Sequence, residues 1–266
     1  MKDNFCSLTK KIANVVYLNM EPEILFENND VIVVDKPSGL MVHADGTADE
    51  RTLVDWLLEH DPNVQGVGEP GFAKDGSALE RSGVVHRLDR DTSGVMVLAK
   101  HQAAFEHLKA QFHDRLAKKE YRAFVYGPVR ERWGTIDKSI GRSPRDFRLR
   151  LAGPGAKGTL RDAVTEWECI GTGRHQDELY SYLKLKPKTG RTHQIRVHLK
   201  SISRPVVGDP LYAASEIERL PNLGIDRLAL HAHRLLITLP DGEEGAFIAP
   251  EPIAFIQAAE LLVAEA

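Results

Sequence analysis

A chain of 266 residues is long enough to bury a substantial core in one large or two modest domains. Hydrophobic residues make up 42% of it and charged residues 27%, as in ordinary soluble proteins, which excludes disordered, collagen-like and coiled-coil chains. No apolar run approaches the ~20 residues of a bilayer span, and the first residues lack the pattern of a secretion signal. The isolated cysteines Cys6 and Cys169 fit a reducing compartment. We therefore expect a cytoplasmic protein.

The positive charges are concentrated in one part of the chain. Between Arg115 and Arg204 there are 21 Lys and Arg residues against 9 Asp and Glu, whereas the remaining residues hold 14 against 29, for a net charge of −3. Such asymmetry predicts a phosphate-attracting surface on an otherwise acidic protein. The alternative is a solvated charged face.

The N-terminal part of the chain predicts an extension, a hairpin and a helix. Residues 1–23 hold only scattered apolar side chains, so we interpret them as an N-terminal extension. Short strands are expected at 24–26 and 31–34, joined by a polar turn. A helix is expected from Thr52 to His60, with Thr52 as its cap.

A long loop is expected next, because residues 64–83 are rich in Gly, Pro and Ser and have no periodicity. Within the loop, residues 66–71 match the glycine pattern of dinucleotide-binding proteins. That pattern needs a strand before it and a helix after it, and neither is expected here. The sequence therefore does not predict a nucleotide site.

The rest of the chain alternates strands and helices with hairpin-like spacing. Apolar periodicity predicts helices at 102–115, 192–202 and 252–263. Strands are expected at 95–98, 119–126, 134–141, 163–170, 179–185 and 228–239, the last as one long strand or a pair. The basic segment 142–161, interrupted by Pro and Gly, predicts a positively charged hairpin or arm. Because regular βαβ alternation is missing, we expect an α+β fold with a mixed, mainly antiparallel sheet and flanking helices.

The polar turn from His86 to Gly94 holds the first candidate for a reacting group. Asp89 lies between Arg87 and Arg90, whose charges favour the ionised carboxylate, so Asp89 would be available as a nucleophile or base. The alternative is a turn aspartate that pairs with arginine for structural reasons. Local sequence alone does not choose between the two.

A second candidate is the donor-rich segment 189–200. Thr192 is expected to cap a helix on which His193, Arg196 and Lys200 share one side, opposite an apolar face. Such a line of donors suits phosphates or a buried carboxylate. The alternative is an amphipathic helix with a solvated polar face.

A third candidate is Tyr121, which follows Lys118 and Lys119 at the start of a strand. It could stack on a base or hold a hydroxyl near a reacting centre, and the alternative is an ordinary strand tyrosine. Metal binding is not expected, because His193 and His198 are five residues apart and do not share a helical face.

These segments occur together in an order that resembles a known family. The matching segments are Lys36–Gly39, His86–Gly94, Lys188–His198, Val206–Tyr212 and Leu228–Arg234. Over roughly residues 24–250 the chain closely resembles the RluA family of pseudouridine synthases. Two regions, 43–46 and 64–83, depart from the family pattern and are expected to touch RNA.

The resemblance implies roles for individual residues. Asp89 matches the catalytic aspartate, Tyr121 the active-site tyrosine, and Arg196 the basic residue that pairs with the aspartate. Arg87 matches the arginine that helps to displace the target base from its helix. The implied fold is a mainly antiparallel sheet with an RNA-binding cleft and a mobile arm near 142–161. Residues 24–266 would form the catalytic domain, without the small RNA-binding domain that precedes it in many relatives.

The expected activity is isomerisation of uridine to pseudouridine in ribosomal or transfer RNA, with flipping of the target base. The reaction changes neither mass nor redox state, so no cofactor and no metal are expected. We expect a monomer whose partner is RNA and not a membrane. RNA contacts are expected from His86, Arg87, Arg90, Lys118, Lys119, Arg191, His193, Gln194 and His198. The alternatives are a hydrolytic base glycosidase and an RNA-binding or RNA-folding module without turnover.

Overall fold

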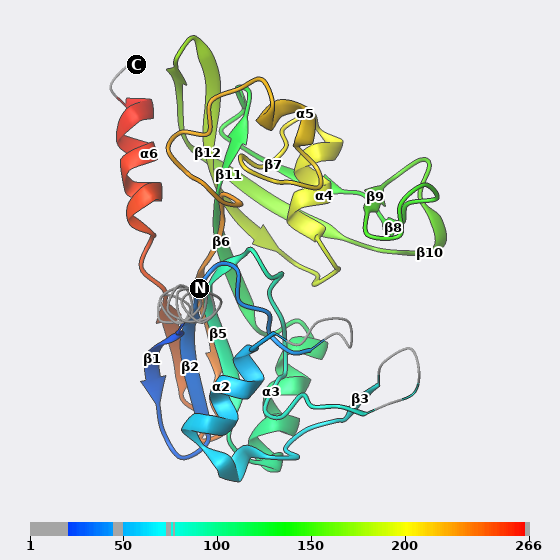
Figure 1. Cartoon of the computed structure of the whole chain (residues 1–266), viewed down its shortest axis with the longest axis vertical. Coiled ribbons are helices and arrows are strands. Elements are labelled where there is room, and N and C mark those ends of the chain that lie inside the picture. Colours follow the sequence, from blue (N-terminus) through cyan, green and yellow to red (C-terminus); the bar gives the residue numbers. More distant parts are fainter. Residues whose placement is uncertain (1–20, 45–49, 73–75, 77, 264–266) are drawn as a thin grey trace, which may run out of the picture. The chain divides into compact units, whose positions relative to one another are not determined.

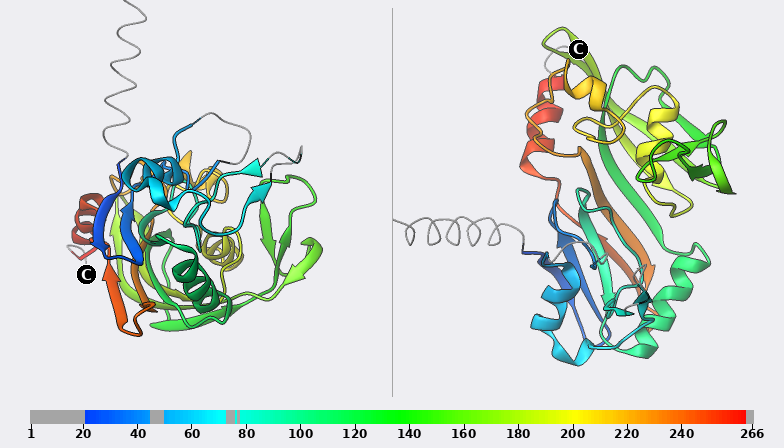
Figure 2. Two further views of the ribbon diagram at one scale, coloured as in Figure 1. Left: turned by 90° about the horizontal axis from the view of Figure 1, so that it is seen from below. Right: turned by 45° about the vertical axis from the view of Figure 1, so that its right-hand side comes forward.

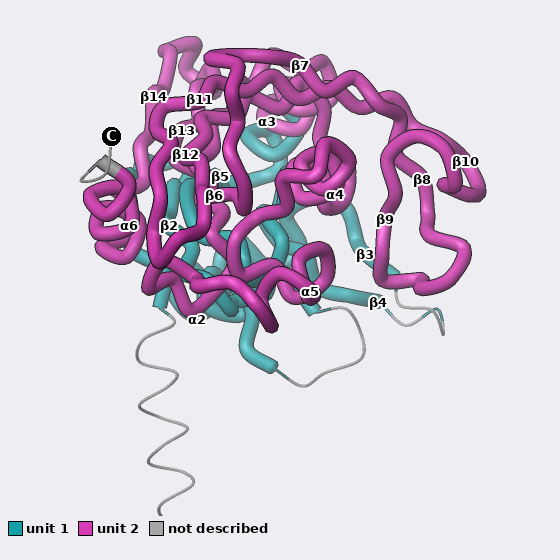
Figure 3. Tube along the Cα trace, turned by 90° about the horizontal axis from the view of Figure 1, so that it is seen from above, with its two compact units in different colours: residues 1–106 teal, residues 107–266 magenta. Residues whose placement is uncertain are grey.

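The computed structural model describes residues 21–44, 50–72, 76 and 78–263. The chain forms two compact units, residues 1–106 (unit 1) and residues 107–266 (unit 2), which Figure 3 shows in different colours. Of the expected N-terminal extension 1–23, all but the last three residues lie outside the described part. The basic stretch from Arg115 to Arg204 belongs entirely to unit 2.

Three strands of unit 1 pair antiparallel in the order β1-β2-β5. Their bounds are Glu23–Glu27 for β1, Val31–Lys36 for β2 and Ser93–Ala99 for β5. The β1–β2 hairpin is confirmed, and the Asn28 side chain closes its turn by accepting the backbone N–H groups of Asp30 and Val31 at 2.9 Å each. The four apolar residues at the start of β2 are fully buried, which explains their unbroken apolar run.

Helix α2, Leu53–His60, begins where the sequence predicted. The Thr52 hydroxyl accepts the N–H of Asp55 at 3.3 Å, and the Asp55 carboxylate accepts the N–H of Thr52 at 2.8 Å, which makes a reciprocal capping box. A short 3₁₀ helix, η1, follows at Pro62–Val64. Helix α3 runs from Gln102 to His113 and ends two residues before the predicted end, at a turn in which Arg115 has a φ of 62°.

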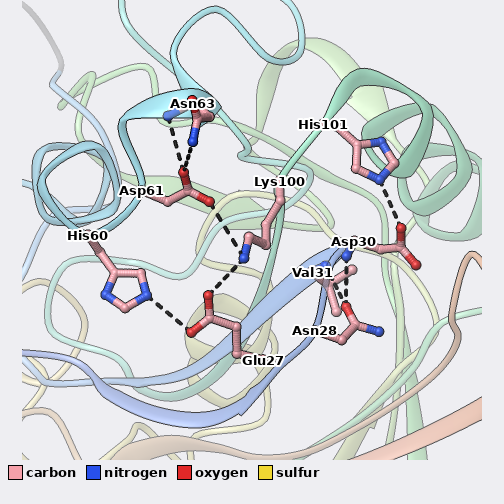
Figure 4. Close-up of polar contacts among 9 residues, drawn as sticks. All are labelled: Glu27, Asn28, Asp30, Val31, His60, Asp61, Asn63, Lys100 and His101. Atoms are coloured by element: carbon pink, nitrogen blue, oxygen red, sulfur yellow. Dashed lines mark hydrogen bonds and ion pairs between the residues drawn. The ribbon is translucent and has the colours of Figure 1, made fainter.

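A charged network joins three ends of elements in unit 1 (Figure 4). The Lys100 ammonium lies 2.8 Å from a Glu27 carboxylate oxygen and 3.5 Å from one of Asp61, and the His60 ring lies 3.1 Å from Glu27. The hydrogen bond from Lys100 lowers the pKa of Glu27, and the same bond raises the pKa of Lys100. The network therefore ties the end of β1 to the end of α2 and the chain after β5.

The predicted loop 64–83 contains more order than expected. Its described part includes two-residue strands, β3 at Gly71–Phe72 and β4 at Ala78–Leu79, which pair antiparallel. The Ser82 hydroxyl accepts the N–H of Gly66 at 2.7 Å, which holds the base of the loop. Strands of two residues are too short to leave a periodic pattern, so the sequence did not reveal them.

The main sheet of unit 2 is antiparallel, in the order β13-β6-β12-β11-β7, and β14 also pairs with β13. The bounds are β6 Lys118–Tyr126, β7 Trp133–Asp137, β11 Val164–His175, β12 Glu178–Pro187, β13 Leu230–Thr238 and β14 Glu244–Ile248. The region 228–239 is thus one long strand. The sequence did not predict β14 or the short helix α5, Ala214–Ile217. The α+β class with a mainly antiparallel sheet is confirmed.

The basic segment forms a small sheet of its own, which we call the arm sheet, residues 140–161. Its antiparallel strands, in the order β10-β8-β9, are β8 Ile140–Arg142, β9 Arg150–Ala152 and β10 Lys157–Arg161. The single strand predicted at 134–141 is wrong, because β7 and β8 belong to different sheets. Figures 1 and 2 show the arm sheet beyond helix α4.

Two helices lie on the two sides of the β11–β12 pair, α4 at Gln194–Ser201 and α6 at Ile253–Val263 (Figure 1). On the α6 side, the Phe124 and Tyr182 rings stack with centroids 4.2 Å apart, and Phe255 packs edge-on against Phe124. A Cβ at Gly173 would lie 2.1 Å from the backbone oxygen of Leu262, so α6 needs a glycine there. The other face of the sheet is left for α4 and the candidate site.

Candidate active site

The Asp89 turn in unit 1 is held by a buried lysine. The side chain of Lys36, at the end of β2, is fully buried, and its ammonium donates to the backbone oxygens of Pro37 (2.8 Å), Leu40 (2.7 Å) and Arg90 (3.0 Å). These carbonyls belong to turns, where no strand partner is available to them. Lys36 therefore fixes the backbone next to Asp89.

Further bonds join the same two turns. The Ser38 hydroxyl donates to the backbone oxygen of Asp91 at 2.7 Å, and the N–H of Gly39 donates to Arg90 at 2.9 Å. Asp89 itself closes a turn, because its backbone oxygen accepts the N–H of Thr92 at 3.1 Å, and its side chain is half-buried. The motifs 36–39 and 86–94 thus form one platform that presents Asp89.

Three other residues of the segment 86–94 are expected to contact RNA, and they differ in exposure and in contacts: His86, Arg87 and Arg90. The Arg87 side chain is exposed, with one guanidinium nitrogen 3.3 Å from the Nε2 of His43. Arg90 is also exposed and binds the backbone oxygen of Gly39 and the carboxylate of Glu50. The Nε2 of His86 accepts the backbone N–H of Val97 at 3.1 Å, so this ring has a structural contact within unit 1. Of the segment 43–46, only the first two residues are described.

In unit 2, Tyr121 lies on β6, opposite Leu185 of β12 and Ala232 of β13. Side chains alternate along a strand, so Lys119 shares the face of Tyr121 whereas Lys118 lies on the opposite face. The Lys119 ammonium is close to Gly190, and burial lowers the pKa of Lys119. An RNA contact by Lys118 would therefore use the other face of the sheet, and it stays a prediction.

The start of helix α4 corrects one expectation. Thr192 is not the cap: the helix begins at Gln194, and His193 precedes it with a φ of 55° and no capping bond from its side chain. The Gln194 side chain instead holds the loop before the helix. Its oxygen accepts the Arg191 N–H at 3.0 Å, and its nitrogen donates to the backbone oxygen of Val164 at 3.0 Å. A buried glutamine thereby anchors the helix start to β11.

Arg196 has a bidentate carboxylate partner within unit 2. Its Nε and one terminal nitrogen lie 2.7 Å from the two carboxylate oxygens of Asp209, and both side chains are buried. The N–H groups of Leu211 and Tyr212 also donate to Asp209, at 3.0 and 3.1 Å. Asp209 lies in the family segment Val206–Tyr212, but no role was predicted for it from the sequence. Its signal was an aspartate followed by a proline turn, 13 residues after Arg196.

The Tyr212 hydroxyl connects the arm sheet to this cluster. It accepts the backbone N–H of Arg150 at 2.9 Å and lies 3.0 Å from the Nδ1 of His193. The Arg196 guanidinium lies over the Tyr212 ring, 5.2 Å from its centroid. The arm sheet, the loop before α4 and Arg196 are therefore held by one side chain.

His198 is completely buried, with its ring nitrogens 2.9 Å from the Thr165 hydroxyl and 3.0 Å from the backbone oxygen of Lys138. Burial lowers the pKa of His198, so the ring is neutral at pH 7. Gln194 is similarly occupied inside the protein. These contacts fit a positioning role for both residues, and the direct RNA contacts expected from them stay predictions.

The three expected catalytic residues come from both units, Asp89 from unit 1 and Tyr121 and Arg196 from unit 2. On unit 2, Tyr121 and Lys119 share one face of β6, and the Lys119 ammonium lies close to Gly190. The pairing of Arg196 with Asp89 stays a prediction.

Within the described residues, no three His, Cys, Asp or Glu side chains are grouped so as to hold a metal ion. In the same part of the chain, no helix is long and apolar enough to cross a bilayer.

Comparison with known proteins addresses the chain as a whole. Residues 30–201, a range that runs through both units, match the profile of the family described as RNA pseudouridylate synthase. The chain is 38% identical over 244 residues to an uncharacterized RNA pseudouridine synthase of Synechocystis, covering 91% of this chain and 69% of that protein. It is 39% identical over 240 residues to ribosomal large subunit pseudouridine synthase D of Xanthomonas campestris, covering 86% and 66%.

A solved structure, human RNA pseudouridylate synthase domain containing 1, superposes with a TM-score of 0.68 at 27% identity, covering 88% of this chain and 84% of that one. The chain spans about two thirds of the length of the two curated relatives. The range matched by the family profile includes Asp89, Tyr121 and Arg196. The chain therefore belongs to the RluA family of RNA pseudouridine synthases.

Proposed function

We propose that this chain isomerises uridine to pseudouridine in large-subunit ribosomal RNA, with Asp89, Tyr121 and Arg196 as its catalytic residues. The observation that carries the proposal is the family match over residues 30–201. Ribosomal RNA is favoured over transfer RNA by relatives named ribosomal large subunit pseudouridine synthase D, in Xanthomonas campestris and Neisseria meningitidis. We further propose that the protein acts in the cytoplasm as a monomer, with residues 24–266 as one catalytic domain.

The chemistry accounts for the carboxylate. The bond from C1′ to N1 of the uracil breaks, the base turns, and C1′ joins C5, which gives up its proton while N1 gains one. An ionised Asp89 could attack C1′, remove a sugar proton or add to C6 of the ring. Tyr121, or a water that it holds, would take the C5 proton. The atoms and electrons of the nucleotide balance without a redox partner.

The target base must first leave its stack, which costs a few kcal/mol. Arg87 suits this step because its guanidinium is exposed and only loosely held by His43. We propose that His86, Arg90, Lys118, Lys119, Arg191 and His193 contact the RNA, and that Gln194 and His198 act through the loop and strand that they hold. Arg196, buried against Asp209, would keep the charge of Asp89 in place from a fixed position.

The test is Asp89→Asn, with Asp91→Asn as the matched control in the same turn. Turnover is measured as tritium release from RNA labelled at C5 of uridine, and the product is mapped by carbodiimide labelling. We expect Asp89→Asn to reduce turnover on the order of a thousandfold or more, about 4 kcal/mol, with RNA affinity kept. Asp91→Asn should retain most of the activity. Release of free uracil would indicate a glycosidase, and unchanged modification in cells carrying Asp89→Asn would indicate a binding module.

A further inference from the structure

One proton of the proposed reaction still needs a source. Once C1′ has joined C5 of the uracil, C5 loses a proton and N1 gains one. Tyr121, or a water that it holds, would take the proton from C5, and a second group must supply the proton to N1. Both atoms belong to one ring, so this second group must lie near Tyr121 and must hold a proton that it can release.

Lys119 lies near Tyr121 on the same strand. The two residues are separated by one position on β6, so their side chains project from the same face of the strand. At the rise of an antiparallel strand, their Cα atoms are roughly 7 Å apart. A base held against Tyr121 is therefore within reach of the long Lys119 side chain.

The surroundings hold the stem of Lys119 and leave its end uncovered by residue 190. Leu235 of β13 lies directly opposite Lys119 and is buried, so the aliphatic stem of the lysine has an apolar neighbour. The ammonium extends to the loop before α4, where a Cβ at Gly190 would lie 3.7 Å from it. Because residue 190 is a glycine, it places no side chain over the ammonium.

The Lys119 ammonium has no counter-charge within the described part of the chain. Among these residues it makes neither a hydrogen bond nor an ion pair, and its side chain is half-buried. The adjacent Glu120 lies on the opposite face of β6, where Arg122 binds it at 2.6 Å and also binds Glu251 at 3.2 Å. A half-buried charge without a partner destabilises a fold, and a purely structural lysine would not need to remain unpaired.

These surroundings suit a group that releases a proton. Burial lowers the pKa of Lys119, and no neighbouring carboxylate opposes the shift. Its ammonium therefore releases a proton more readily than that of an exposed lysine. Arg191 and Arg196 do not offer this chemistry, because a guanidinium group keeps its protons in a protein.

We propose that Lys119 is a further catalytic residue, the general acid that delivers a proton to N1 of the uracil once C1′ has joined C5. The inference rests on the proposed function, because it assigns one proton of that reaction. An N–H bond of the ammonium breaks as the N1–H bond forms, which leaves a neutral amine on Lys119. The base releases the C5 proton to solvent and Lys119 takes one from solvent, so the enzyme is restored without a redox partner.

The test compares Lys119→Arg and Lys119→Met with Lys186→Met as the matched control. Arginine keeps the charge but does not release its proton, and Lys186 is an exposed lysine of β12. Single-turnover rates are measured by tritium release from RNA labelled at C5 of uridine, and RNA affinity is measured on the same variants. We expect both Lys119 variants to lose about a hundredfold or more in rate. Lys119→Arg should keep its RNA affinity, and Lys186→Met should match the wild type.

Two further readouts distinguish proton transfer from a structural role. The single-turnover rate of the wild type should fall on the alkaline side, because Lys119 must hold its proton before it can deliver it, and this fall should be absent from Lys119→Arg. Ethylamine, a small primary amine, should restore part of the rate of Lys119→Ala. It should restore none of the rate of Asp89→Asn.

Three results would overturn the proposal. A wild-type rate in Lys119→Arg would show that a fixed charge is sufficient, and an unchanged rate with a raised KM in Lys119→Met would assign Lys119 to RNA binding alone. A Lys119→Ala variant that binds RNA normally, but whose rate ethylamine does not restore, would assign the lysine to structure. Failure of the proposed function differs from all three, because the wild type itself would then form no pseudouridine, and the inference would fall with it.

Discussion

The buried pair of Arg196 and Asp209 offers the sharpest test of how the candidate site is built. Replacing Asp209 by Asn keeps the shape of the side chain and an oxygen that can accept the N–H groups of Leu211 and Tyr212. It removes the negative charge that receives two bonds of 2.7 Å from Arg196. The guanidinium would then be left in the protein interior without its counter-charge.

The expected cost follows from burial. The two side chains are only 4% and 0% exposed, and breaking a buried ion pair by removing one partner costs about 3–5 kcal/mol. For a chain of this length, 1 kcal/mol shifts Tm by roughly 2–4 °C, so Asp209→Asn should lower Tm by roughly 6–20 °C. The matched control is Glu166→Gln, which breaks an ion pair to Lys188 of 2.8 Å between side chains about half exposed. Its expected cost is below about 1 kcal/mol.

The assay is equilibrium unfolding in urea, with turnover measured in parallel. A cost for Asp209→Asn no larger than that for Glu166→Gln would refute the reasoning. The double variant Arg196→Met/Asp209→Asn removes both charges and keeps an oxygen that can accept the N–H groups of Leu211 and Tyr212, so it should recover part of the stability that Asp209→Asn loses. It should not recover turnover, because Arg196 is an expected catalytic residue.

Three further predictions concern single groups. Burial lowers the pKa of His231 to about 4, so unfolding takes up a proton between pH 6.5 and 4, and stability falls as the pH falls through this window. In urea unfolding, His231→Gln should reduce the loss of stability between pH 7 and pH 5 by about 2 kcal/mol. The control His113→Gln, at an exposed position, should leave that loss unchanged. Lys36→Met should cost about 3 kcal/mol of stability and reduce kcat, because it removes the donor to three turn carbonyls. The control Lys100→Met should cost about 1 kcal/mol and leave kcat unchanged. Because burial lowers the pKa of Lys119, RNA affinity should fall earlier on the alkaline side in the wild type than in Lys119→Arg, and parallel curves would contradict the RNA contact expected from Lys119.

Elements with strong local signals were predictable from the sequence. The β1–β2 hairpin has a polar turn between apolar runs, and the start of α2 has a threonine cap with an aspartate three residues later. The end of the β11–β12 hairpin was not predicted. Its turn residues Gln176 and Asp177 both have positive φ, at 48° and 67°, a conformation for which Asn-Gly is the usual signal. Pairing across the long hairpin stabilises a turn that local propensity does not favour.

The sequence allowed candidate site residues to be named, but it did not reveal the contacts that these residues make. Asp89, Tyr121 and Arg196 were named as candidates from the chemistry of their side chains and from the resemblance of the surrounding motifs. The partnership of Arg196 with Asp209 was not named, because a bond across 13 residues and a proline turn leaves no periodic trace. The same limit explains Thr192, which looked like a cap although the helix begins two residues later, at the buried Gln194.

Several side chains of the dense polar motifs hold backbone groups of the protein, whatever contacts they make with substrate. Asp89, the expected catalytic carboxylate, lies on a turn, and turns have carbonyl and N–H groups without partners in a sheet or helix. Lys36 satisfies carbonyls beside Asp89, Gln194 satisfies the loop before α4, and Asp209 satisfies the turn that follows it. Substituting such positioning residues should lower stability and kcat together. Substituting a residue whose only task is to contact RNA should raise KM without loss of stability. A motif residue can therefore be assigned to one group or the other by measuring both quantities on the same variant.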